Sequence, residues 1–381
     1  MRVIHVTPSY KPAYIYGGPT MSVSMLCEQL TKAGHDLQVY TTTANGVKEL
    51  DVTPNKLTTV DGVPVIYFKR ITKDHTHFSP ALLKALWKNV KGYDVVHIHA
   101  WWNLVSLFSC LIALLRGVPV VVSPRGTLSN YSHHNKNNLA KALIQYLLGK
   151  PMLNKCHLHV TSVLEYNAVS TMLKPKSIAN LPNFVKLPAV SQEAIRAISS
   201  PFKLIFLSRI EEKKGLDILI KALPLLNFPY TLTIAGDGDE NYINELKALT
   251  YKYKTGQNIN WVGFQTDRKF KLLQEHDLLV LPSHDENFGN VIIESLGEGT
   301  AVLVSKFVGL VNYVIDNNMG WQCNTDEVSL STTLNSIAID GNKLNQIRLN
   351  APSIIRVDFD EESLTEKYAD MYTNIIANGR L

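Results

Sequence analysis

The sequence predicts an α/β protein made of two domains, each built around a parallel β-sheet. Short aliphatic segments alternate with helical patterns along the chain, and this alternation is typical of a parallel sheet covered by helices. The length of 381 residues exceeds one typical domain and suits two. A hydrophobic content of 45% gives both halves enough apolar side chains to form a core.

A polar, interrupted stretch separates the two halves and is interpreted as the interdomain linker, within residues 186–202. The first domain is expected over residues 1–190 and the second over residues 200–361. A final amphipathic pattern at residues 362–381 predicts a helix that packs back on the first domain.

Charge is divided unevenly between the halves. Residues 1–190 contain 20 Lys or Arg and 8 Asp or Glu, whereas residues 191–381 contain 18 and 25. The basic first half therefore predicts an anionic partner, which could be a membrane surface, a phosphorylated acceptor or nucleic acid. Nucleic acid is the least favoured of these because the basic half has no recognisable recognition motif.

Cysteine usage and hydropathy bear on the compartment. The four cysteines are scattered without metal-type spacing, which indicates a reduced, cytoplasmic environment. Residues 1–10 have the pattern of a strand rather than of a signal peptide. The most apolar run, residues 104–122, is interrupted by Arg116, Gly117 and Pro119, so it predicts a helix, a turn and a strand rather than a membrane span.

Residues 275–305 carry the most informative pattern of the chain. A short apolar strand, a polar loop, a helix and a second apolar strand form one βαβ unit. The loop therefore lies at the carboxyl end of a parallel strand, where open α/β sheets bind their ligands. Glu286 in this loop and Glu294 in the helix are candidates for binding the hydroxyl groups of a sugar nucleotide.

A phosphate site beside this helix needs donors and positive charge. Backbone N–H groups at Phe288, Gly289 and Asn290 open the helix, where the helix dipole attracts an anion. Arg209 and Lys214 follow the first strand of the second half, and a guanidinium fork and an ammonium group both suit diphosphate oxygens. These five residues therefore predict diphosphate binding.

Two further loops are candidates for ligand contacts. Val262, Gly263 and Phe264 end another strand of the second half, in a position suited to a nucleoside base. In the first half, Gly17 and Gly18 precede the first helix and would let backbone amides meet a phosphate or a sugar, although a plain turn also explains a glycine pair.

The basic half adds two candidate side chains and one candidate surface. His99 ends a strand and is a candidate catalytic residue facing the ligand, whereas His97 is expected to pack inside. Arg125 follows the next strand and is, with His99 and Glu286, a candidate catalytic residue. Residues 131–155 contain no acid and have an amphipathic pattern, so this helix could rest on an anionic membrane or pack on the core with a solvated basic face.

These motifs, in this order, resemble the retaining glycosyltransferases of family 4, which have the GT-B fold of two Rossmann-like domains facing a central cleft. The resemblance covers almost the whole chain. Its strongest signals are Glu286 and Glu294 with FGN between them, and the segment SRIEEKKG at residues 208–215. Weaker signals are Gly17–Gly18, the segment DVVHIH, Thr161, Ser162, Glu165 and the pair Pro182–Asn183.

The resemblance implies a nucleotide-sugar donor and a role for each residue. Arg209 and Lys214 would hold the diphosphate, Glu294 the ribose hydroxyls, and Glu286 the donor sugar beside its reacting carbon. The helix amides would bind phosphate or sugar, and the loop that ends at Phe264 would meet the base. The family works without a metal or another cofactor, since Arg, Lys and amide groups stabilise the leaving diphosphate. No metal site is therefore expected.

Three positions depart from the family pattern. Many members have a catalytic His where this chain has Arg125, and because Arg cannot act as a base at neutral pH its role would be electrostatic. Sequences with this PRG motif resemble a subset that acts in bacterial polysaccharide assembly. Phe184 replaces a common glycine, and Ala301 replaces a common proline.

The function that these patterns imply is transfer of a sugar from a nucleotide diphosphate, UDP favoured over GDP, to a hydroxyl of a lipid-linked or growing bacterial glycan. Such a glycan could be an O antigen, a capsule or an exopolysaccharide, made at the inner face of the cytoplasmic membrane. The alternatives are a GT-B sugar-nucleotide epimerase, a phosphorylase, or a non-catalytic partner that binds a nucleotide or glycan. The sequence leaves the base, the sugar, the acceptor, the linkage and the oligomeric state open.

Overall fold

A computed structural model describes residues 1–128, 145–188 and 198–379 and divides the chain into two units. The first unit consists of Met1–Phe184 with Glu361–Leu381, and the second of Val185–Asp360. Much of the helix expected within residues 131–155, and of the linker expected within 186–202, lies outside the described residues. No helix in the described part of the chain is long and apolar enough to cross a membrane.

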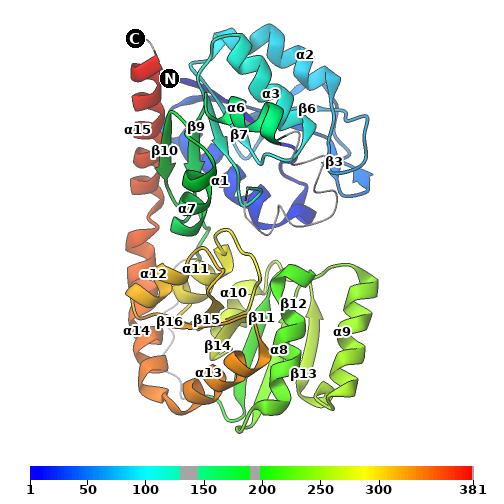
Figure 1. Ribbon diagram of the computed structural model, residues 1–381, viewed down its shortest axis with the longest axis vertical. Coiled ribbons are helices and arrows are strands. Elements are labelled where there is room, and N and C mark those ends of the chain that lie inside the picture. Colours follow the sequence, from blue (N-terminus) through cyan, green and yellow to red (C-terminus); the bar gives the residue numbers. More distant parts are fainter. Residues whose placement is uncertain (129–144, 189–197, 380–381) are drawn as a thin grey trace. The chain divides into compact units, whose positions relative to one another are not determined.

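The first unit is built on an eight-stranded sheet in the order β10-β9-β8-β7-β1-β2-β6-β5 (Figure 1). Its strands pair in parallel except for β5, which pairs antiparallel with β6. The strands are β1 Arg2–Val6, β2 Asp36–Thr42, β5 Leu57–Val60, β6 Val63–Phe68, β7 Val95–His99, β8 Val120–Ser123, β9 His157–Val160 and β10 Ser177–Asn180, with a separate hairpin of β3 Ala44–Asn45 and β4 Lys48–Glu49.

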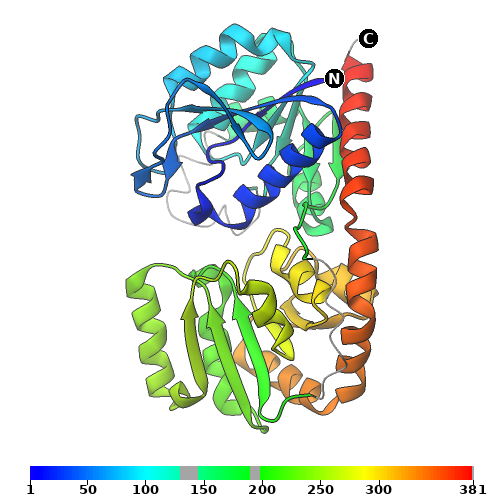
Figure 2. The same ribbon diagram turned by 180° about the vertical axis from the view of Figure 1, so that it is seen from behind.

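Helices cover both faces of this sheet. The helices α2, α3, α6 and α7 lie on one face, and α1 and α15 lie on the other (Figures 1 and 2). The side chains of each group form one of two cores. Ser79, Asn103 and Ser162 cap α2, α3 and α7, because each side-chain oxygen accepts a backbone N–H of the first turn. The bounds are η1 Tyr14–Tyr16, α1 Gly18–Lys32, α2 Pro80–Asn89, η2 Val90–Gly92, α3 Leu104–Leu115, η3 Gln145–Gly149, α6 Lys150–Leu153, α7 Val163–Met172 and α15 Glu361–Gly379.

The last helix, α15, completes the core of the first unit although it follows the whole second unit in sequence. Its apolar side chains belong to the same cluster as side chains of α1, β1 and β2, and Tyr368 and Tyr372 are almost fully buried there. The amphipathic pattern explains this position, since residues three and four apart line one face of a helix. The first unit is therefore discontinuous in sequence.

The second unit has a six-stranded sheet, parallel throughout, in the order β13-β12-β11-β14-β15-β16. The strands are β11 Phe202–Leu207, β12 Tyr230–Ala235, β13 Ile259–Gly263, β14 Leu278–Leu281, β15 Ala301–Ser305 and β16 Gly320–Cys323. The helices are η4 Glu212–Lys214, α8 Leu216–Ala222, η5 Leu223–Leu225, α9 Glu240–Lys252, η6 Gly256–Asn258, α10 Lys269–Gln274, α11 Asn290–Gly297, α12 Val311–Asp316, α13 Glu327–Ile339 and α14 Gly341–Asp358.

The strand order of the second unit defines a topological switch point. The chain leaves β11 toward β12 on one side, and it returns to pair β14 with the other side of β11. In a doubly wound parallel sheet the ligand binds beyond the carboxyl ends of the strands at such a point. The loops that follow β11 and β14 are therefore the place to look for a binding site.

Candidate functional site

The loops after β11 and β14 lie against each other. The N–H group of His284 donates to the carbonyl oxygen of Lys213 at 2.8 Å. Gly215 has a left-handed backbone, and a Cβ at this position would lie 2.3 Å from the carbonyl oxygen of Pro282. Glycine is therefore required where these two loops meet at the switch point.

Lys214 and Glu286 form an ion pair across these loops. Their side chains are only 7% and 18% exposed. Burial acts to raise the pKa of Glu286, but the charge and hydrogen bond of Lys214, together with the charges of Lys213 and Arg209, outweigh burial and hold this pKa below its ordinary value. Glu286 is consequently a carboxylate at neutral pH, held at the switch point beside three cations.

The backbone of Glu286 is fixed as well as its side chain. Its N–H group donates to the carbonyl oxygen of Phe307 at 3.1 Å, and its carbonyl oxygen accepts from the N–H group of Gly309 at 2.8 Å. These two bonds make Glu286 an isolated parallel bridge with Val308. The carboxylate is thus presented from an anchored loop, as a preorganised site requires.

Arg209 is the more exposed cation of this site. Its guanidinium pairs with Glu211 at 2.6 Å, and the two side chains are 43% and 35% exposed. Surface pairs of this kind are weak, so Arg209 can exchange Glu211 for a stronger anionic ligand. Burial, followed by the charge of Lys214, lowers the pKa of the neighbouring Lys213.

The helix α11 begins beside Glu286. Gly289 precedes it in a left-handed conformation, and no side chain caps the helix. Phe288 is 2% exposed and packs edge-on against Phe359, with ring centroids 6.3 Å apart. Of the three residues expected at the helix start, Phe288 thus contributes its side chain to the core, while Asn290 is the first helical residue.

Glu294 lies in α11 and has a different partner. Its carboxylate pairs with Lys269 of α10 at 2.7 Å, and the two side chains are 13% and 24% exposed. Glu286, in contrast, lies in the loop before the helix, so the two acids are held by separate lysines. A ligand that binds both acids must replace or share both lysines.

A third loop of this unit lies at the carboxyl end of β13. Val262 and Phe264 are 37% and 59% exposed, and Gly263 between them has a positive φ of 68°. The carbonyl oxygen of Gly263 accepts from the N–H group of Gly236 at 2.9 Å, which joins this loop to the end of β12. The three residues therefore offer apolar side chains and backbone at the same sheet edge as the switch point.

Arg125 is the centre of the strand-end loops in the first unit. It has a positive φ of 53°, at the turn that follows β8. Its Nη1 donates to Ser22 at 3.0 Å and to Asn183 at 2.9 Å, and its Nε donates to Nδ1 of His99 at 3.3 Å. Burial lowers the pKa of Arg125. A guanidinium remains protonated at neutral pH, so Arg125 acts as a fixed positive charge.

The glycine pair lies near this arginine. Gly17 has a φ of 65° and precedes α1, which begins at Gly18. Ser22 in the first turns of α1 accepts the hydrogen bond from Arg125. The start of α1 and the loop of Arg125 are therefore joined at one edge of the first sheet.

His99 was expected to face the ligand, but the structure buries it. It is 1% exposed and lies in a buried cluster with three other histidines: His5, His97 and His159. Burial, followed by the charges of His97 and Arg125, holds the pKa of His99 well below its ordinary value. A buried neutral imidazole that accepts from Arg125 positions that side chain, which is a different role from direct catalysis. His97 is buried, as predicted.

The contacts of His99 define its tautomer. Its Nδ1 accepts from Arg125, so a neutral ring carries its proton on Nε2. Nε2 then donates to Nδ1 of His5 at 2.9 Å. Three imidazoles of this cluster have ligand atoms within 4.8 Å of one another. They fit a metal ion poorly, because both ring nitrogens of His97 and of His99 serve hydrogen bonds, Nε2 of His5 is the one ring nitrogen of the three residues without such a partner in the described part of the chain, and a cation there would face Arg125.

A second chain of hydrogen bonds joins α15 to the strand ends. His159 donates from Nε2 to the carbonyl oxygen of Leu181 at 3.0 Å, so its Nδ1 accepts from Ser123 at 2.6 Å. Ser123 in turn accepts from Nε2 of His97 at 2.6 Å, and Nδ1 of His97 accepts from the hydroxyl of Tyr372 at 2.6 Å. Each group has one consistent direction of donation, so the chain is fully satisfied.

Several of these partners could not be found as site residues from sequence. The pattern at Thr161 and Glu165 and the residue Asn183 pointed to this region, and Glu165 indeed accepts the N–H groups of Gly126 at 2.7 Å and Thr161 at 3.0 Å. Ser22, His5, His159 and Tyr372 lie in strands and helices whose patterns indicate only burial. Their proximity depends on the sheet order, which the local sequence does not specify.

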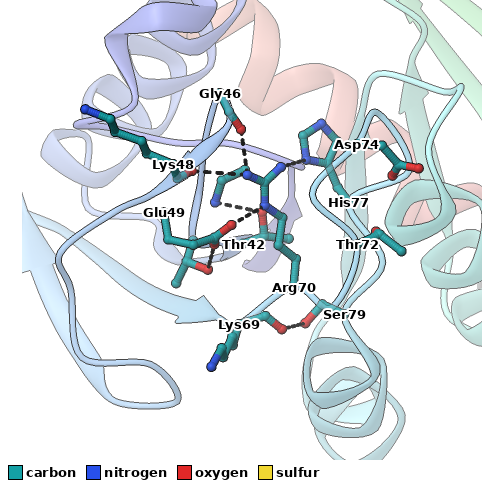
Figure 3. A network of polar contacts seen from close by, with 12 residues as sticks. Thr42, Gly46, Lys48, Glu49, Lys69, Arg70, Thr72, Asp74, His77 and Ser79 are labelled. Atoms are coloured by element: carbon teal, nitrogen blue, oxygen red, sulfur yellow. Dashed lines mark hydrogen bonds and ion pairs between the residues drawn. The ribbon is translucent and has the colours of Figure 1, made fainter.

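A separate polar network organises the loops beyond β6 and β2 (Figure 3). Arg70 is 4% exposed, and its guanidinium pairs with Glu49 at 2.7 Å. The same group donates to the carbonyl oxygens of Gly46 at 2.7 Å and Lys48 at 3.1 Å and contacts His77 at 3.3 Å. One buried arginine thus connects the β3–β4 hairpin with the loop before α2.

The two units, with cationic strand-end loops in each, define an α/β protein of the GT-B fold. Residues 191–353 match the family described as glycosyl transferases group 1, and residues 16–185 match the family described as Glycosyltransferase Family 4. The chain belongs to the family 4 glycosyltransferases. It is therefore a glycosyltransferase.

The matches to individual relatives cover nearly the whole chain. A glycogen synthase of Mycobacterium tuberculosis is 26% identical over 98% of this chain and 94% of its own length. The Anabaena protein HepE, solved in complex with UDP and glucose, has a TM-score of 0.75 at 19% identity and covers 98% of this chain and 100% of its own. WaaG, described as a glycosyltransferase involved in lipopolysaccharide biosynthesis, has a TM-score of 0.70 at 17% identity over 97% and 99%.

Proposed function

We propose that this protein is a retaining, metal-independent glycosyltransferase that moves a sugar from a nucleotide diphosphate to a hydroxyl of a lipid-linked or growing bacterial glycan. The observation that carries the proposal is the buried pair of Lys214 and Glu286 at the switch point of the second sheet. Such a pair places a cation for a diphosphate next to a carboxylate for sugar hydroxyls. Burial strengthens both interactions, because they act in a less polar surrounding than water.

Donor binding is assigned to the second unit. Arg209 and Lys214 hold the diphosphate, and amides at the start of α11 add to them. Glu286 binds hydroxyls of the donor sugar, and Glu294 binds the ribose. The negative diphosphate releases Lys214 in part from Glu286, which frees the carboxylate to accept from the sugar.

The loop of Val262, Gly263 and Phe264 is assigned to the base. Its exposed apolar side chains suit a planar ring, and its backbone offers hydrogen bonds. We favour UDP over GDP because HepE, which has the same fold, was solved with UDP and with UDP-glucose.

The chemistry proposed needs no metal and no other cofactor. Loss of the nucleotide diphosphate develops negative charge on its leaving oxygen, and Arg209, Lys214 and the α11 amides stabilise that charge. The acceptor hydroxyl attacks from the face that the diphosphate leaves, and the leaving phosphate takes its proton. The reacting carbon thus keeps its configuration.

Acceptor binding is assigned to the first unit. Arg125 presents a fixed charge beside the start of α1 at Gly17 and Gly18. A fixed cation beside a helix start suits the phosphate of a lipid-linked acceptor. WaaG, named for lipopolysaccharide biosynthesis, supports a bacterial surface glycan as the product class, and the lipid-linked acceptor places the protein at the cytoplasmic face of a membrane.

The experiment is a transfer assay with a panel of radiolabelled UDP-, GDP- and ADP-sugars and a lipid-diphosphate sugar as acceptor. We expect transfer, or slow donor hydrolysis, with a UDP-sugar, unchanged by a metal chelator. Glu286→Gln should lower turnover by about 100-fold or more. Glu245→Gln, an exposed acid of the same unit, is the matched control and should be neutral.

Absence of transfer and hydrolysis across the whole panel would contradict the proposal. A changed sugar on the nucleotide without any acceptor would instead identify an epimerase. Nucleotide binding without turnover, with glycan assembly in cells unaffected by Glu286→Ala, would identify a non-catalytic partner.

A further inference from the structure

The two faces of the first sheet differ in charge. Between Asp94 and Glu165 the sequence has no acid, and this stretch supplies α3, η3 and α6. The helix α2 is free of acids as well. The opposite face is covered by α1 and α15, and α15 carries the acids Glu361, Glu362, Glu366 and Asp370. The described helices on one face therefore carry net positive charge, and those on the opposite face carry net negative charge.

The same face carries exposed apolar side chains. Trp87 of α2 is 47% exposed, and Leu111 and Leu115 of α3 are 37% and 66% exposed. Leu147 and Leu148 of η3 are 58% and 51% exposed. Among the described residues, α1 and α15 contribute none of the large exposed apolar side chains. Contiguous exposed apolar groups of this kind indicate an interaction surface.

The elements that carry these side chains pack side by side. α3 packs against both α2 and α6, and η3 runs directly into α6 (Figure 1). Arg116 lies over the ring of Trp87, 5.0 Å from its centroid, which joins the end of α3 to α2. We call this surface the basic apolar face. It consists of the apolar residues Trp87, Leu111, Leu115, Leu147 and Leu148 and the basic residues Lys84, Lys88, Lys91, Arg116, Lys150 and Lys155.

The composition of α3 is unusual for a helix at the surface of a protein. Its sequence LVSLFSCLIALL has no charged residue. A helix that is apolar all round normally lies inside a protein or against lipid. One side of α3 contributes Val105, Ser109 and Cys110 to the core, while Leu111 and Leu115 remain exposed. Water is a poor solvent for that exposed side.

From this arrangement we infer that the basic apolar face binds the surface of an anionic lipid bilayer, with its leucines and Trp87 in the headgroup region and its lysines on the phosphates. The inference rests on the proposed lipid-linked acceptor and assigns the membrane contact to described helices of the first unit. Charge complementarity indicates that the partner is an anionic lipid surface, since exposed lysines around an apolar centre match acidic headgroups. Trp suits the interface because its ring is apolar and its N–H is polar.

Vesicle flotation tests this inference with the full-length protein. The vesicles contain phosphatidylcholine with about one third phosphatidylglycerol, or phosphatidylcholine alone. We expect binding to the anionic vesicles, weaker binding to the neutral ones, and a loss of binding as salt rises. Leu115→Glu should weaken binding by at least about tenfold, and Lys88→Gln by about fivefold.

The matched control is Val328→Glu on α13 of the second unit, which is 63% exposed and receives the same charge. It should bind vesicles as the unchanged protein does. Slow hydrolysis of the donor shows that each variant is folded, and none of these residues belongs to the proposed donor site. Lys88→Gln keeps the test valid if Leu115→Glu does not fold.

Two results would overturn the inference. One is a lack of binding to anionic vesicles, which is also the result expected if another protein covers this face. The other is binding that Leu115→Glu and Lys88→Gln leave unchanged. Vesicle binding and sugar transfer are read separately, so transfer to a soluble acceptor without vesicle binding contradicts the inference alone. Vesicle binding without any transfer contradicts only the proposed function.

Discussion

Each unit has a cationic side chain at its strand ends, Lys214 in the second unit and Arg125 in the first, and the two differ in whether their partners carry a charge. Lys214 is neutralised by Glu286 in an ion pair, so a donor must compete with a carboxylate. Arg125, in contrast, donates its hydrogen bonds to neutral groups among the described residues, namely the side chains of Ser22, His99 and Asn183. The charge of Arg125 is therefore held in place without being cancelled by a bonded carboxylate, which suits an anionic ligand.

Substitution of Lys214 and of Arg209 should have different consequences. Lys214→Met leaves Glu286 buried without its partner, and we expect the free energy of unfolding to fall by about 3 kcal/mol. Arg209→Met removes an exposed cation, so stability should change little. Both should weaken UDP binding. Urea unfolding and nucleotide titration measure the two quantities separately, and equal stability of the two variants would contradict the role of the buried pair.

The positions of these residues could be predicted from sequence, but their partners could not. Arg209, Lys214 and Glu286 each follow a strand in a βα connection, so their place at the carboxyl edge of a parallel sheet follows from the pattern. The pairing of Lys214 with Glu286 depends on β11 lying next to β14, which is a property of strand order. The burial of His99 beneath Arg125 was not predicted, because a strand pattern does not show whether a neighbouring loop covers the last residue of the strand.

At the scale of elements, Arg70 organises a whole group of loops. A guanidinium offers donors in several directions, and Arg70 uses them on Glu49, on two backbone carbonyl groups and on His77 (Figure 3). Without these bonds the hairpin of β3 and β4 keeps its own short ladder and a few bonds to neighbours, such as that from the N–H of Gly46 to the hydroxyl of Tyr16 at 2.9 Å, and isolated two-stranded hairpins are marginal in water. Arg70 therefore supplies three of the hydrogen bonds that hold the hairpin from outside.

Arg70→Lys should loosen this hairpin although it keeps the charge. A lysine cannot reach the same acceptors, so Glu49 and the carbonyl oxygens of Gly46 and Lys48 lose bonds, and we expect a loss of about 2 kcal/mol in the free energy of unfolding. Limited proteolysis should then cut within residues 44–49. Arg268→Lys, an exposed arginine of the second unit, serves as the control. Protease resistance equal to that of the unchanged protein would refute the prediction.

For the whole molecule, the buried histidines make stability depend on pH. Burial, followed by the charge of Arg125, lowers the pKa of His5 and of His159 to about 3. In the unfolded chain an imidazole has a pKa of about 6.5. Between these values the unfolded chain binds more protons than the folded one, so stability is complete above the unfolded pKa and is lost as pH falls.

We expect the free energy of unfolding to be lower at pH 5 than at pH 7.5 by about 4 kcal/mol from these two histidines alone, each contributing about 2 kcal/mol. His97 and His99 change it in the same direction, because burial also lowers their pKa. His159→Gln should reduce the difference by about 2 kcal/mol, whereas the exposed His75→Gln should leave it unchanged. Urea unfolding at the two pH values provides the measurement, and parallel curves for His159→Gln and the unchanged protein would exclude this explanation.

The position of α15 also sets an order of events during synthesis. Tyr368 and Tyr372 belong to the core of the first unit, yet the ribosome makes them only after the entire second unit. At about 5–20 residues per second this interval lasts roughly 10 to 35 seconds. During that time the apolar surface that α15 covers lies open, and Nδ1 of His97 lacks its donor, the hydroxyl of Tyr372. The unit that is translated first is thus the last to be completed, and a nascent chain at this stage is a natural client for chaperones.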